Sequence, residues 1–242
     1  MLNTNFPFYG IAIILSLIVN VIVVIFCAKK YNFTRDELIG ALIYENVGII
    51  MGAMVLSYLQ SPYVHEGFDL TRVGLTAYGG VIGAIVCLVI FGLQFKKTIG
   101  QMLFTFMPSI PIMYAIGKIG CFFAGCCHGI EYNGFGSVVY NYSLAAPANI
   151  SLFPVQIVET VVFTGIFIYM INRAIKNKFD FKTLGFSFIL CGFAKFALDF
   201  LRMSHTGQIS LNQIISIAFI IIGVWLFFIV NREKSILQAV DK

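Results

Sequence analysis

Three thiols and one imidazole are crowded into a single short segment, Gly117 to Gly129, which reads GKIGCFFAGCCHG. The reactive side chains are Cys121, Cys126, Cys127 and His128. Thiolates and imidazoles bind zinc and copper, and a thiolate near a cation is a nucleophile. Because Cys126 and Cys127 are adjacent, unlike the usual pairs of zinc ligands, we expect no metal site. A disulfide between Cys121 and Cys126, a low-pKa nucleophile beside Lys118 or His128, and apolar packing all remain open.

Ionisable side chains also lie within or beside long apolar stretches. They comprise three acids and three bases, Glu45, Glu159 and Asp199 against Lys118, Lys195 and Arg202. An ionised side chain near a bilayer centre costs about 2.5–3.5 kcal/mol, so each one implies a partner or a function. In one interpretation they merely form ion pairs, Lys195 with Asp199 and Lys118 with one of the glutamates. Because Lys118 and Lys195 lie next to glycines, cysteines or helix breaks, we instead expect them to bind an anionic lipid headgroup, above all its phosphate.

Four of the polar residues share one predicted helix face. Cys191, Lys195, Asp199 and Arg202 follow one another at intervals of four, four and three residues. At about 1.5 Å per residue this face climbs about 16 Å. The spacing predicts a polar ladder that points into a helix bundle and ends at the outer surface.

The elements that must position these residues are membrane helices. Of the 242 residues, 59% are hydrophobic and 11% charged, against about 45–50% and about 25% in soluble domains. Soluble, disordered, coiled-coil and nucleic-acid-binding proteins need more charged residues than this chain has. We therefore do not interpret the net charge of +5 as a basic patch for RNA or DNA. The composition predicts an all-α polytopic membrane protein with seven transmembrane helices of roughly 20 residues. The stretches are Phe8 to Ala28, Ile39 to Leu59, Leu75 to Leu93, Met102 to Ile119, Val155 to Ile171, Leu184 to Leu201 and Ile214 to Val230.

The distribution of Lys and Arg predicts the orientation. If the N-terminus is outside, four inner segments hold most of the 16 Lys and Arg residues. The outer side then holds Arg72, Lys118 and Arg202. Because cytoplasmic loops carry the excess of basic residues, we expect an outer N-terminus, a cytoplasmic C-terminus and a single membrane domain, residues 1–242.

In this orientation the chemistry belongs at the outer face. The extracytoplasmic loop 129–154, between the fourth and fifth helices, is rich in Tyr, Asn, Gly and Ser, and long loops of this kind are often lids or binding surfaces. Residues 60–73 form a second outer cover, and His65 and His205 fall near the same face.

Two further patterns concern helix geometry. Pro108 and Pro111 should kink the fourth helix. Glycines four residues apart let helix backbones approach closely, and we favour packing for Gly48 and Gly52, whereas packing and a functional role compete at Gly79-Gly80 and at Gly125 to Gly129.

The segment Gly117 to Gly129 resembles the signature of the prolipoprotein diacylglyceryl transferases, Gly-Arg-Ile-Gly-Asn-Phe-x-x-Gly-Glu-x-x-Gly. The similarity continues along nearly the whole chain. Further matching segments are Phe8-Tyr9-Gly10, Gly48 to Tyr58, Gly74 to Gly83, Phe153 to Glu159, Lys195 to Arg202 and Gln213 to Ile217.

The resemblance implies a seven-helix enzyme of the bacterial inner membrane with its N-terminus outside. It also implies transfer of the diacylglyceryl group of phosphatidylglycerol to the cysteine thiol of a lipoprotein precursor, with release of glycerol phosphate. In such a reaction cations hold the phosphate and a base helps to ionise the thiol. By the resemblance, Lys118 and Lys195 occupy the positions of two key arginines, and Tyr78 stands where the family has a histidine.

Several positions depart from the family pattern. Met54 replaces an arginine, Cys121 an asparagine, Cys126 a glutamate and Cys191 a tyrosine. Lysine lacks the bidentate fork of arginine, and a tyrosine hydroxyl, with a pKa of about 10, is a poor base at neutral pH. The changes indicate retuned or replaced chemistry in one polar pocket.

The sequence therefore predicts a membrane transferase that moves a diacylglyceryl or related lipid group from an anionic phospholipid to a thiol acceptor, such as a lipoprotein precursor. It predicts no cofactor, metal or nucleic-acid partner. The catalytic candidates are Tyr78, Lys118, Cys126 and Lys195, and the substrate-binding candidates are Tyr9, Cys121, Cys127, His128, Gly129, Gln156, Glu159 and Arg202. Two alternatives remain open, a non-catalytic lipid-binding or transport protein and a thiol redox or metal protein.

Overall fold

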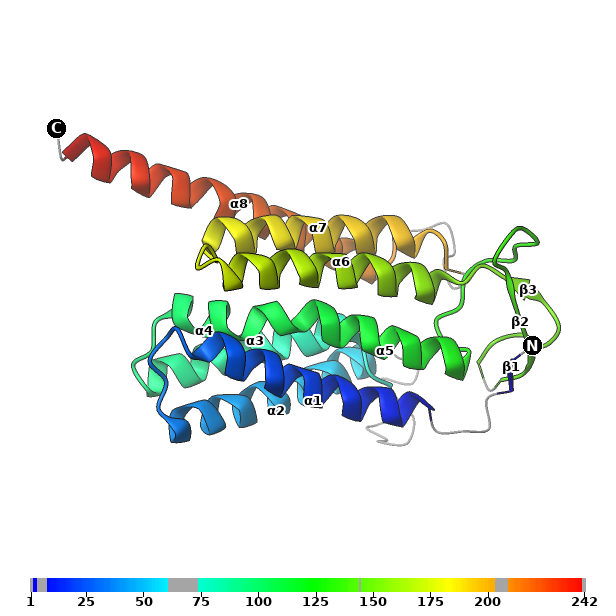
Figure 1. Cartoon of the computed structure of the whole chain (residues 1–242). Coiled ribbons are helices and arrows are strands. Elements are labelled where there is room, and N and C mark those ends of the chain that lie inside the picture. Colours follow the sequence, from blue (N-terminus) through cyan, green and yellow to red (C-terminus); the bar gives the residue numbers. More distant parts are fainter. Residues whose placement is uncertain (1, 4–7, 61–73, 144, 203–208, 241–242) are drawn as a thin grey trace. The chain divides into compact units, whose positions relative to one another are not determined.

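The computed structural model describes residues 2–3, 8–60, 74–143, 145–202 and 209–240. His65, Arg72 and His205, and the greater part of the predicted outer cover 60–73, lie outside these described residues. The helices are α1 (Phe8–Ala28), α2 (Arg35–Leu59), α3 (Ala77–Gln94), α4 (Ile99–Phe106), the 3-10 helix η2 (Met107–Ser109), α5 (Ile110–Ala124), α6 (Val155–Ile175), α7 (Phe181–Asp199) and α8 (Leu211–Val240) (Figure 1). The strands are β1 (Leu2–Asn3), β2 (Val138–Tyr142) and β3 (Ser151–Leu152).

Within the described residues, seven helical segments are long and apolar enough to cross a membrane, with Ile99–Ala124 counted as one segment. This finding confirms the prediction of an all-α polytopic membrane protein with seven transmembrane helices. The outer location of the N-terminus and the cytoplasmic location of the C-terminus stay predictions.

Four of these helices begin earlier than the hydropathy pattern predicts, because polar residues cap them. Ser210 and Gln213 cap α8, which begins at Leu211, ahead of the predicted Ile214. Thr34 and Glu37 form a capping box that starts α2 at Arg35, ahead of the predicted Ile39. Thr98 starts α4 in the same way at Ile99. Asp180 caps α7, which begins at Phe181. Side chains that satisfy the first backbone N–H groups therefore set these boundaries, not apolarity.

The helix that carries Pro108 and Pro111, for which a kink was predicted, changes to 3-10 geometry at Pro108. The 3-10 turn η2 separates α4 from α5, and the hydroxyl of Ser109 donates to the carbonyl of Phe106 at 2.7 Å. A proline inside a helix removes a backbone donor, so this local change of geometry is expected.

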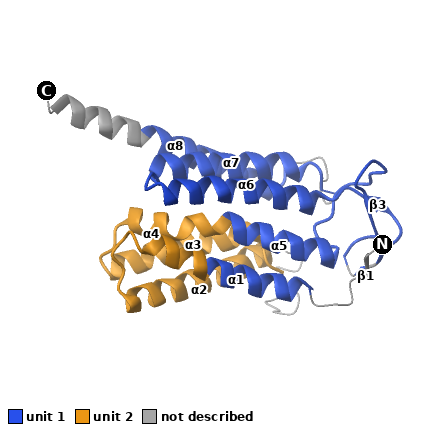
Figure 2. Cartoon of the chain, viewed as in Figure 1, with its two compact units in different colours: residues 1–20, 111–242 blue, residues 21–110 orange. Residues whose placement is uncertain are grey.

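The chain forms two compact units, residues 1–20 with 111–242 and residues 21–110 (Figure 2). In the second unit the backbones of α2 and α3 are in close contact at their glycines. A Cβ atom at Gly52 would collide with the carbonyl oxygen of Gly79, and one at Gly83 would collide with that of Gly48. This is the close approach that small residues four apart allow, so the predicted packing role of Gly48 and Gly52 is confirmed.

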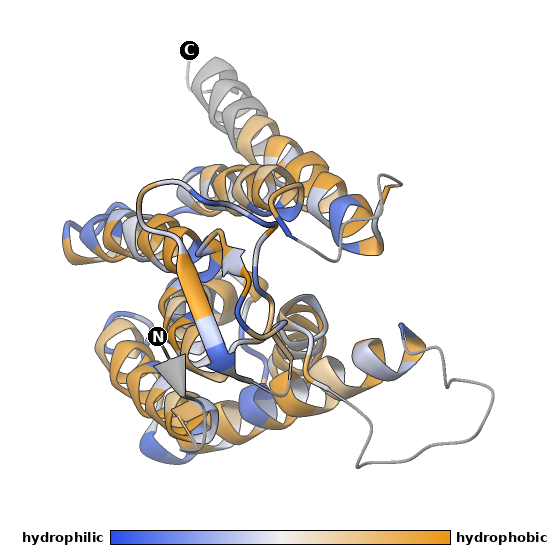
Figure 3. Cartoon of the chain, turned by 90° about the vertical axis from the view of Figure 1, so that its right-hand side faces the viewer, coloured by the Kyte–Doolittle hydropathy of each residue, from blue (hydrophilic) through white to orange (hydrophobic). Residues whose placement is uncertain are grey.

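In the first unit α6, α7 and α8 lie together, and α7 contacts α8 through glycines (Figure 1). A Cβ at Gly185 would lie 2.6 Å from the carbonyl oxygen of Gly223, and one at Gly192 would lie 2.7 Å from that of Ser216. The helices turn large apolar side chains outward, for example Ile221, Trp225 and Phe228 of α8, which are 60–63% exposed. Hydrophobic residues dominate the helices in Figure 3, as lipid-facing surfaces require.

Residues 129–154 of the first unit contain β2 and β3, which the sequence analysis did not predict. The sheet order is β1-β2-β3, with β1 parallel and β3 antiparallel to β2. Tyr140, Ala146 and Leu152 form a small buried cluster, and the hydroxyl of Tyr140 donates to the carbonyl of Phe122 at 2.7 Å. The segment is thereby folded onto the end of α5, where the thiols are.

Candidate functional site

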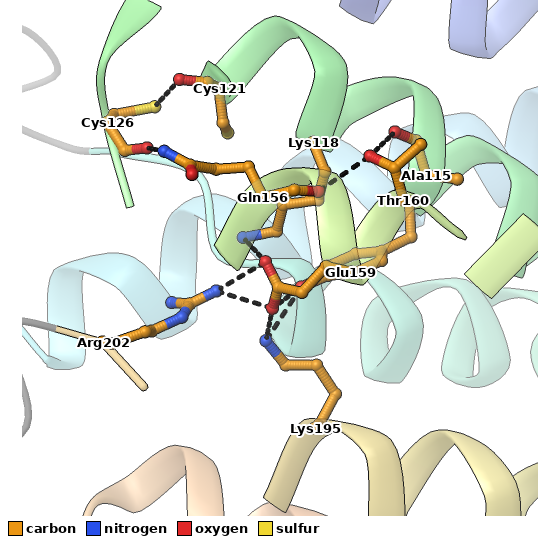
Figure 4. A network of polar contacts seen from close by, with 10 residues as sticks. Ala115, Lys118, Cys121, Cys126, Gln156, Glu159, Thr160, Lys195 and Arg202 are labelled. Carbon is orange, nitrogen blue, oxygen red and sulfur yellow. Dashed lines mark hydrogen bonds and ion pairs between the residues drawn. The ribbon is translucent and has the colours of Figure 1, made fainter. Parts of the chain in front are cut away.

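The carboxylate of Glu159 lies at the centre of a buried cluster of charges in the first unit (Figure 4). One oxygen, Oε2, lies 2.9 Å from Nζ of Lys118. The other, Oε1, lies 2.9 Å from Nζ of Lys195 and 2.9 Å from Nη2 of Arg202. The Glu159 side chain is fully buried, so α5, α6, α7 and the residues after α7 meet at one carboxylate.

Arg202 follows α7, and backbone contacts hold it in place. Its N–H donates to the carbonyl of Asp199 at 3.2 Å, while the N–H of Ile130 donates to the carbonyl of Leu201 at 3.0 Å. Gly129 pairs with Arg202 as an isolated β-bridge, and a Cβ at Gly129 would collide with the carbonyl oxygen of Phe153. The glycine is needed because three chain segments meet there without room for a side chain.

Arg202 stays charged in this setting. Burial disfavours its charged form, yet the neighbouring Glu159 carboxylate outweighs burial and raises the pKa of Arg202 above its usual value. One of its guanidinium nitrogens contacts both carboxylate oxygens, at 2.9 and 3.3 Å.

Tyr114 also belongs to the cluster, although the sequence analysis missed it. Its hydroxyl donates to Glu159 at 2.7 Å and accepts a hydrogen bond from Lys195 at 2.8 Å. Both Lys118 and Lys195 have Nζ 5.2 Å from the centre of its ring, a cation–π distance. The available signal was its position one helical turn before Lys118, which puts both side chains on one face.

The charges of the cluster do not balance. Lys118, Lys195 and Arg202 surround the single carboxylate of Glu159, so these four side chains sum to two positive charges. The pair of Lys118 and Glu159 was one of the predicted ion pairs. Lys195 pairs with Glu159 instead of Asp199, whose carboxylate accepts a hydrogen bond from Ser210 at 2.6 Å. An anion with several acceptor oxygens, such as a phosphate, is the chemical complement of such a cationic cluster.

Gln156 connects this cluster to the thiol segment. It is buried on α6, one turn before Glu159, and its Nε2 donates to the carbonyl of Cys126 at 2.9 Å (Figure 4). Thr160 on the same helix donates to the carbonyl of Ala115 at 3.3 Å. These two contacts fix α6 along α5, and with it the distance between the thiols and the cations.

The three thiols lie close together because of the way α5 ends. Gly125 has a φ of +74°. Its N–H donates to Phe122 and the N–H of Cys126 donates to Cys121, at 3.3 and 3.1 Å. This is the Schellman arrangement, in which the side chains corresponding to Cys121 and Cys126 come into contact. The Sγ atoms of Cys121, Cys126 and Cys127 all lie within 4.8 Å of one another, and all three are free cysteines.

The thiol of Cys126 donates to the backbone carbonyl of Cys121, with the sulfur 3.8 Å from the oxygen. The neighbouring thiols of Cys121 and Cys126 lower the pKa of Cys127 below its usual value. At Cys126 the neighbouring Cys121 thiol lowers the pKa, but the Cys127 sulfur and burial outweigh it and raise that pKa to about 11. Cys127 is exposed and Cys126 half-buried, so the thiolate is held at the accessible position.

The remaining predicted residues are Tyr9, His128 and Tyr78. Tyr9 of α1 packs on α5, where a Cβ at Gly120 would lie 3.4 Å from its Cα. The ring of His128 faces the carbonyl of Gly129, with Nδ1 at 3.3 Å. Tyr78 is buried at the start of α3, in the other compact unit. The first unit thus brings together Lys118, Lys195, Glu159, Arg202, Gln156 and the three cysteines.

The chain is similar to one protein family over almost its entire length. The family model of prolipoprotein diacylglyceryl transferase matches residues 2–229. The chain is 26% identical to phosphatidylglycerol--prolipoprotein diacylglyceryl transferase 2 of Clostridium perfringens (strain 13 / Type A), over 97% of this chain and 94% of that protein. It is 27% identical to the phosphatidylglycerol--prolipoprotein diacylglyceryl transferase of Clostridium tetani (strain Massachusetts / E88), over 94% of each. The protein of that name from Finegoldia magna (strain ATCC 29328 / DSM 20472 / WAL 2508) is 28% identical over 97% of this chain and 94% of its own length.

Proposed function

Since this chain belongs to the prolipoprotein diacylglyceryl transferase family, we propose that it transfers the diacylglyceryl group of an anionic phospholipid, phosphatidylglycerol, to the cysteine thiol of a lipoprotein precursor. It is a multi-pass membrane protein, and we place it in a bacterial inner membrane with its N-terminus outside and its C-terminus in the cytoplasm. The relatives that it matches carry both substrates in their names.

One observation carries the proposal, the surplus of positive charge around Glu159. Lys118, Lys195 and Arg202 bind a single carboxylate, so the cluster can accept a phosphodiester without leaving a buried negative charge unpaired. Burial strengthens each of these electrostatic interactions relative to water. An anionic headgroup is therefore favoured over a neutral one.

The same cations can assist bond cleavage. The acceptor thiol first loses its proton to water. Its sulfur then attacks the glyceryl carbon, a C–S bond forms, and the C–O bond to phosphate breaks. The electron pair of that bond leaves with the phosphate, so glycerol phosphate departs with an additional negative charge. Ammonium and guanidinium groups already fixed by Glu159 and Tyr114 stabilise this charge without rearrangement.

The roles we assign follow from these contacts. Lys118 and Lys195 bind the phosphate, Arg202 supplies further positive charge, and Glu159 positions all three. Gln156 positions the thiol segment beside them, while Tyr9, Gly129 and His128 border it. Tyr78 stays a catalytic candidate through the family resemblance alone.

The experiment combines turnover with a matched control. Purified protein receives phosphatidylglycerol and a peptide with the acceptor cysteine, and the lipidated peptide is measured by mass spectrometry. Lys118→Ala should abolish turnover, whereas Lys176→Ala, which removes an exposed lysine after α6, should leave it unchanged. Full activity of Lys118→Ala would refute the assignment. Rescue of a bacterial strain depleted of its own diacylglyceryl transferase would establish reaction and substrate together.

A second function, lipid binding without catalysis, is favoured by one observation. The charge cluster is intact, whereas by the family pattern Tyr78 stands in place of a histidine. A binding protein would copurify with anionic phospholipid and leave it unconverted. Mass spectrometry of copurified lipids, followed by the turnover assay, separates the two functions.

A further inference from the structure

The three-thiol cluster at the end of α5 has a chemistry that the charge cluster does not need. We propose that Cys121, Cys126 and Cys127 together bind one zinc ion, and that this zinc keeps an open coordination position for the acceptor thiol. The role in binding the acceptor rests on the proposed transfer reaction, whereas zinc binding itself does not.

The sulfur atoms are close enough for a common metal ion. Their Sγ atoms all lie within 4.8 Å of one another. Zinc–sulfur bonds of about 2.3 Å in tetrahedral geometry require sulfur atoms about 3.8 Å apart. The sulfur atoms would therefore have to approach one another by about 1 Å or less.

Several contacts fix the backbone around the thiols. The Schellman turn keeps Cys121 against Cys126, and a Cβ at Gly125 would collide with the hydroxyl of Ser143. Cys127 itself has a φ of +54°, which is uncommon for a residue with a side chain. Gln156 further holds the carbonyl of Cys126. An uncommon backbone conformation at a cysteine that lies beside two others is typical of a functional site.

The charges around the cluster suit a zinc–thiolate centre. Lys118 lies one helical turn before Cys121 on α5. Metal ligands must be deprotonated, and a bound zinc ion itself removes the proton of a coordinating thiol. Three thiolates and a divalent zinc ion sum to one negative charge, which the neighbouring cations balance.

The cluster offers three ligands and room for a fourth from outside. Among the described residues, the group of His, Cys, Asp and Glu side chains able to share a metal consists of these three cysteines. Structural zinc sites have four protein ligands, whereas catalytic sites have three and an exchangeable position. Cys127 is exposed, so the position beside it can be reached from outside the protein.

An open zinc position next to a phosphate site suits thiol alkylation. The acceptor thiol binds zinc as a thiolate, and its proton passes to water. That sulfur then attacks the glyceryl carbon, the C–S bond forms, and the C–O electron pair leaves with the phosphate. The neutral thioether product dissociates from zinc, and water takes its place. A transient lipid on Cys126 or Cys127 is less suitable, because its C–S bond would have to break again with a thiolate as leaving group.

The first test measures metal binding without turnover. The reduced full-length protein in detergent is stripped with a chelator and titrated with Cd²⁺, whose thiolate bonds absorb in the ultraviolet. We expect one equivalent of Cd²⁺ to bind and Zn²⁺ to displace it. Cys126→Ser and Cys127→Ser should each lose this absorption. Cys191→Ala, at a half-buried thiol on α7, should retain it, and the thermal unfolding temperature of each variant verifies its folding.

The second test addresses the open position. Protein loaded with Co²⁺ should change its visible spectrum when a peptide with the acceptor cysteine is added, and should not respond when serine replaces that cysteine. No Cd²⁺ absorption from the reduced protein, or unchanged absorption in Cys126→Ser, overturns the metal site. Metal binding without a response to the cysteine peptide overturns the acceptor role.

The outcomes for the two proposals are separable. Metal binding is measured without lipid, so its loss leaves the transferase assignment untouched. Equal turnover by chelator-stripped and zinc-loaded protein would overturn the zinc mechanism while supporting the transferase. Zinc binding with no turnover under any condition would count against the transferase and leave the metal site in place.

Discussion

Lys118 and Lys195 each place Nζ 2.9 Å from the carboxylate of Glu159, and they use different oxygens of it. The carboxylate therefore acts as a spacer that holds two ammonium groups apart at a fixed distance. Arg202 shares the oxygen that Lys195 uses. A phosphodiester with two free oxygens meets a preformed set of donors, which lowers the entropic cost of binding.

Removal of the central charge should be strongly destabilising. Glu159→Gln leaves Lys118, Lys195 and Arg202 buried without a carboxylate, and loss of one partner of a buried ion pair costs about 3–5 kcal/mol. We expect a lower thermal unfolding temperature in detergent, measured by tryptophan fluorescence or calorimetry. Added phosphatidylglycerol should restore more stability to this variant than to the unmodified protein.

The control for this prediction is Glu131→Gln, at an exposed glutamate, which should behave like the unmodified protein. Equal unfolding temperatures for Glu159→Gln and Glu131→Gln would show that Glu159 is not needed to hold the cations.

The hydroxyl of Tyr114 should matter to both stability and turnover. It bridges Glu159 and Lys195 at 2.7 and 2.8 Å, and a buried hydrogen bond to a charged group contributes about 1.5–3 kcal/mol. Tyr114→Phe keeps the ring against both lysines and removes only this bridge. We expect a loss of about 1–3 kcal/mol in unfolding free energy and a lower kcat with KM less affected. An unchanged kcat would restrict Tyr114 to packing.

The membrane helices could be predicted from the sequence more completely than their ends. Long apolar stretches dictate helices in lipid, so all seven were found. The beginnings of α2, α4, α7 and α8 lie earlier than predicted because polar residues cap their first turns. These residues are Thr34, Thr98, Asp180 and Ser210. Capping residues followed by Glu37 or Gln101 were visible in the sequence and carry more information about a boundary than hydropathy does.

The sequence indicated the charged residues of the candidate site, but not that its three thiols lie close together. Charge inside an apolar stretch has a high cost, which is why Lys118, Glu159 and Lys195 stood out. Tyr114 did not, because a tyrosine in a membrane helix usually only packs. The spacing of Cys126 and Cys127 argued against a shared metal, yet a helix ending in the Schellman arrangement brings Cys121 to Cys126 regardless of ligand-spacing rules. Gly125 was the signal for that turn.

Gly125 should be needed for two reasons that a matched variant can separate. Gly125 and Gly136 both have positive φ, +74° and +78°. A Cβ at Gly125 would collide with Ser143, whereas a Cβ at Gly136 meets nothing within 4 Å. Gly136→Ala should therefore cost only the conformational term, about 1 kcal/mol. Gly125→Ala should cost more and also abolish Cd²⁺ binding, as measured by unfolding and by ultraviolet absorption. Retained Cd²⁺ binding in Gly125→Ala would show that the turn does not set the thiol positions.

Alkylation of the metal-free protein should distinguish the cysteines by pH. The neighbouring thiols of Cys121 and Cys126 lower the pKa of Cys127, so its reactive thiolate persists as the pH falls below the usual thiol range. The pKa of Cys126 is raised to about 11, so its thiolate forms only as the pH rises toward that value. With limiting iodoacetamide at pH 7, peptide mass spectrometry should find the label mainly on Cys127, at a rate that changes little down to mildly acidic pH. Exposure alone would also direct the label to Cys127. In that case the Cys127 thiol would keep its usual pKa, and its alkylation rate would fall about tenfold for each pH unit below that pKa. Such a fall would contradict the lowered pKa of Cys127.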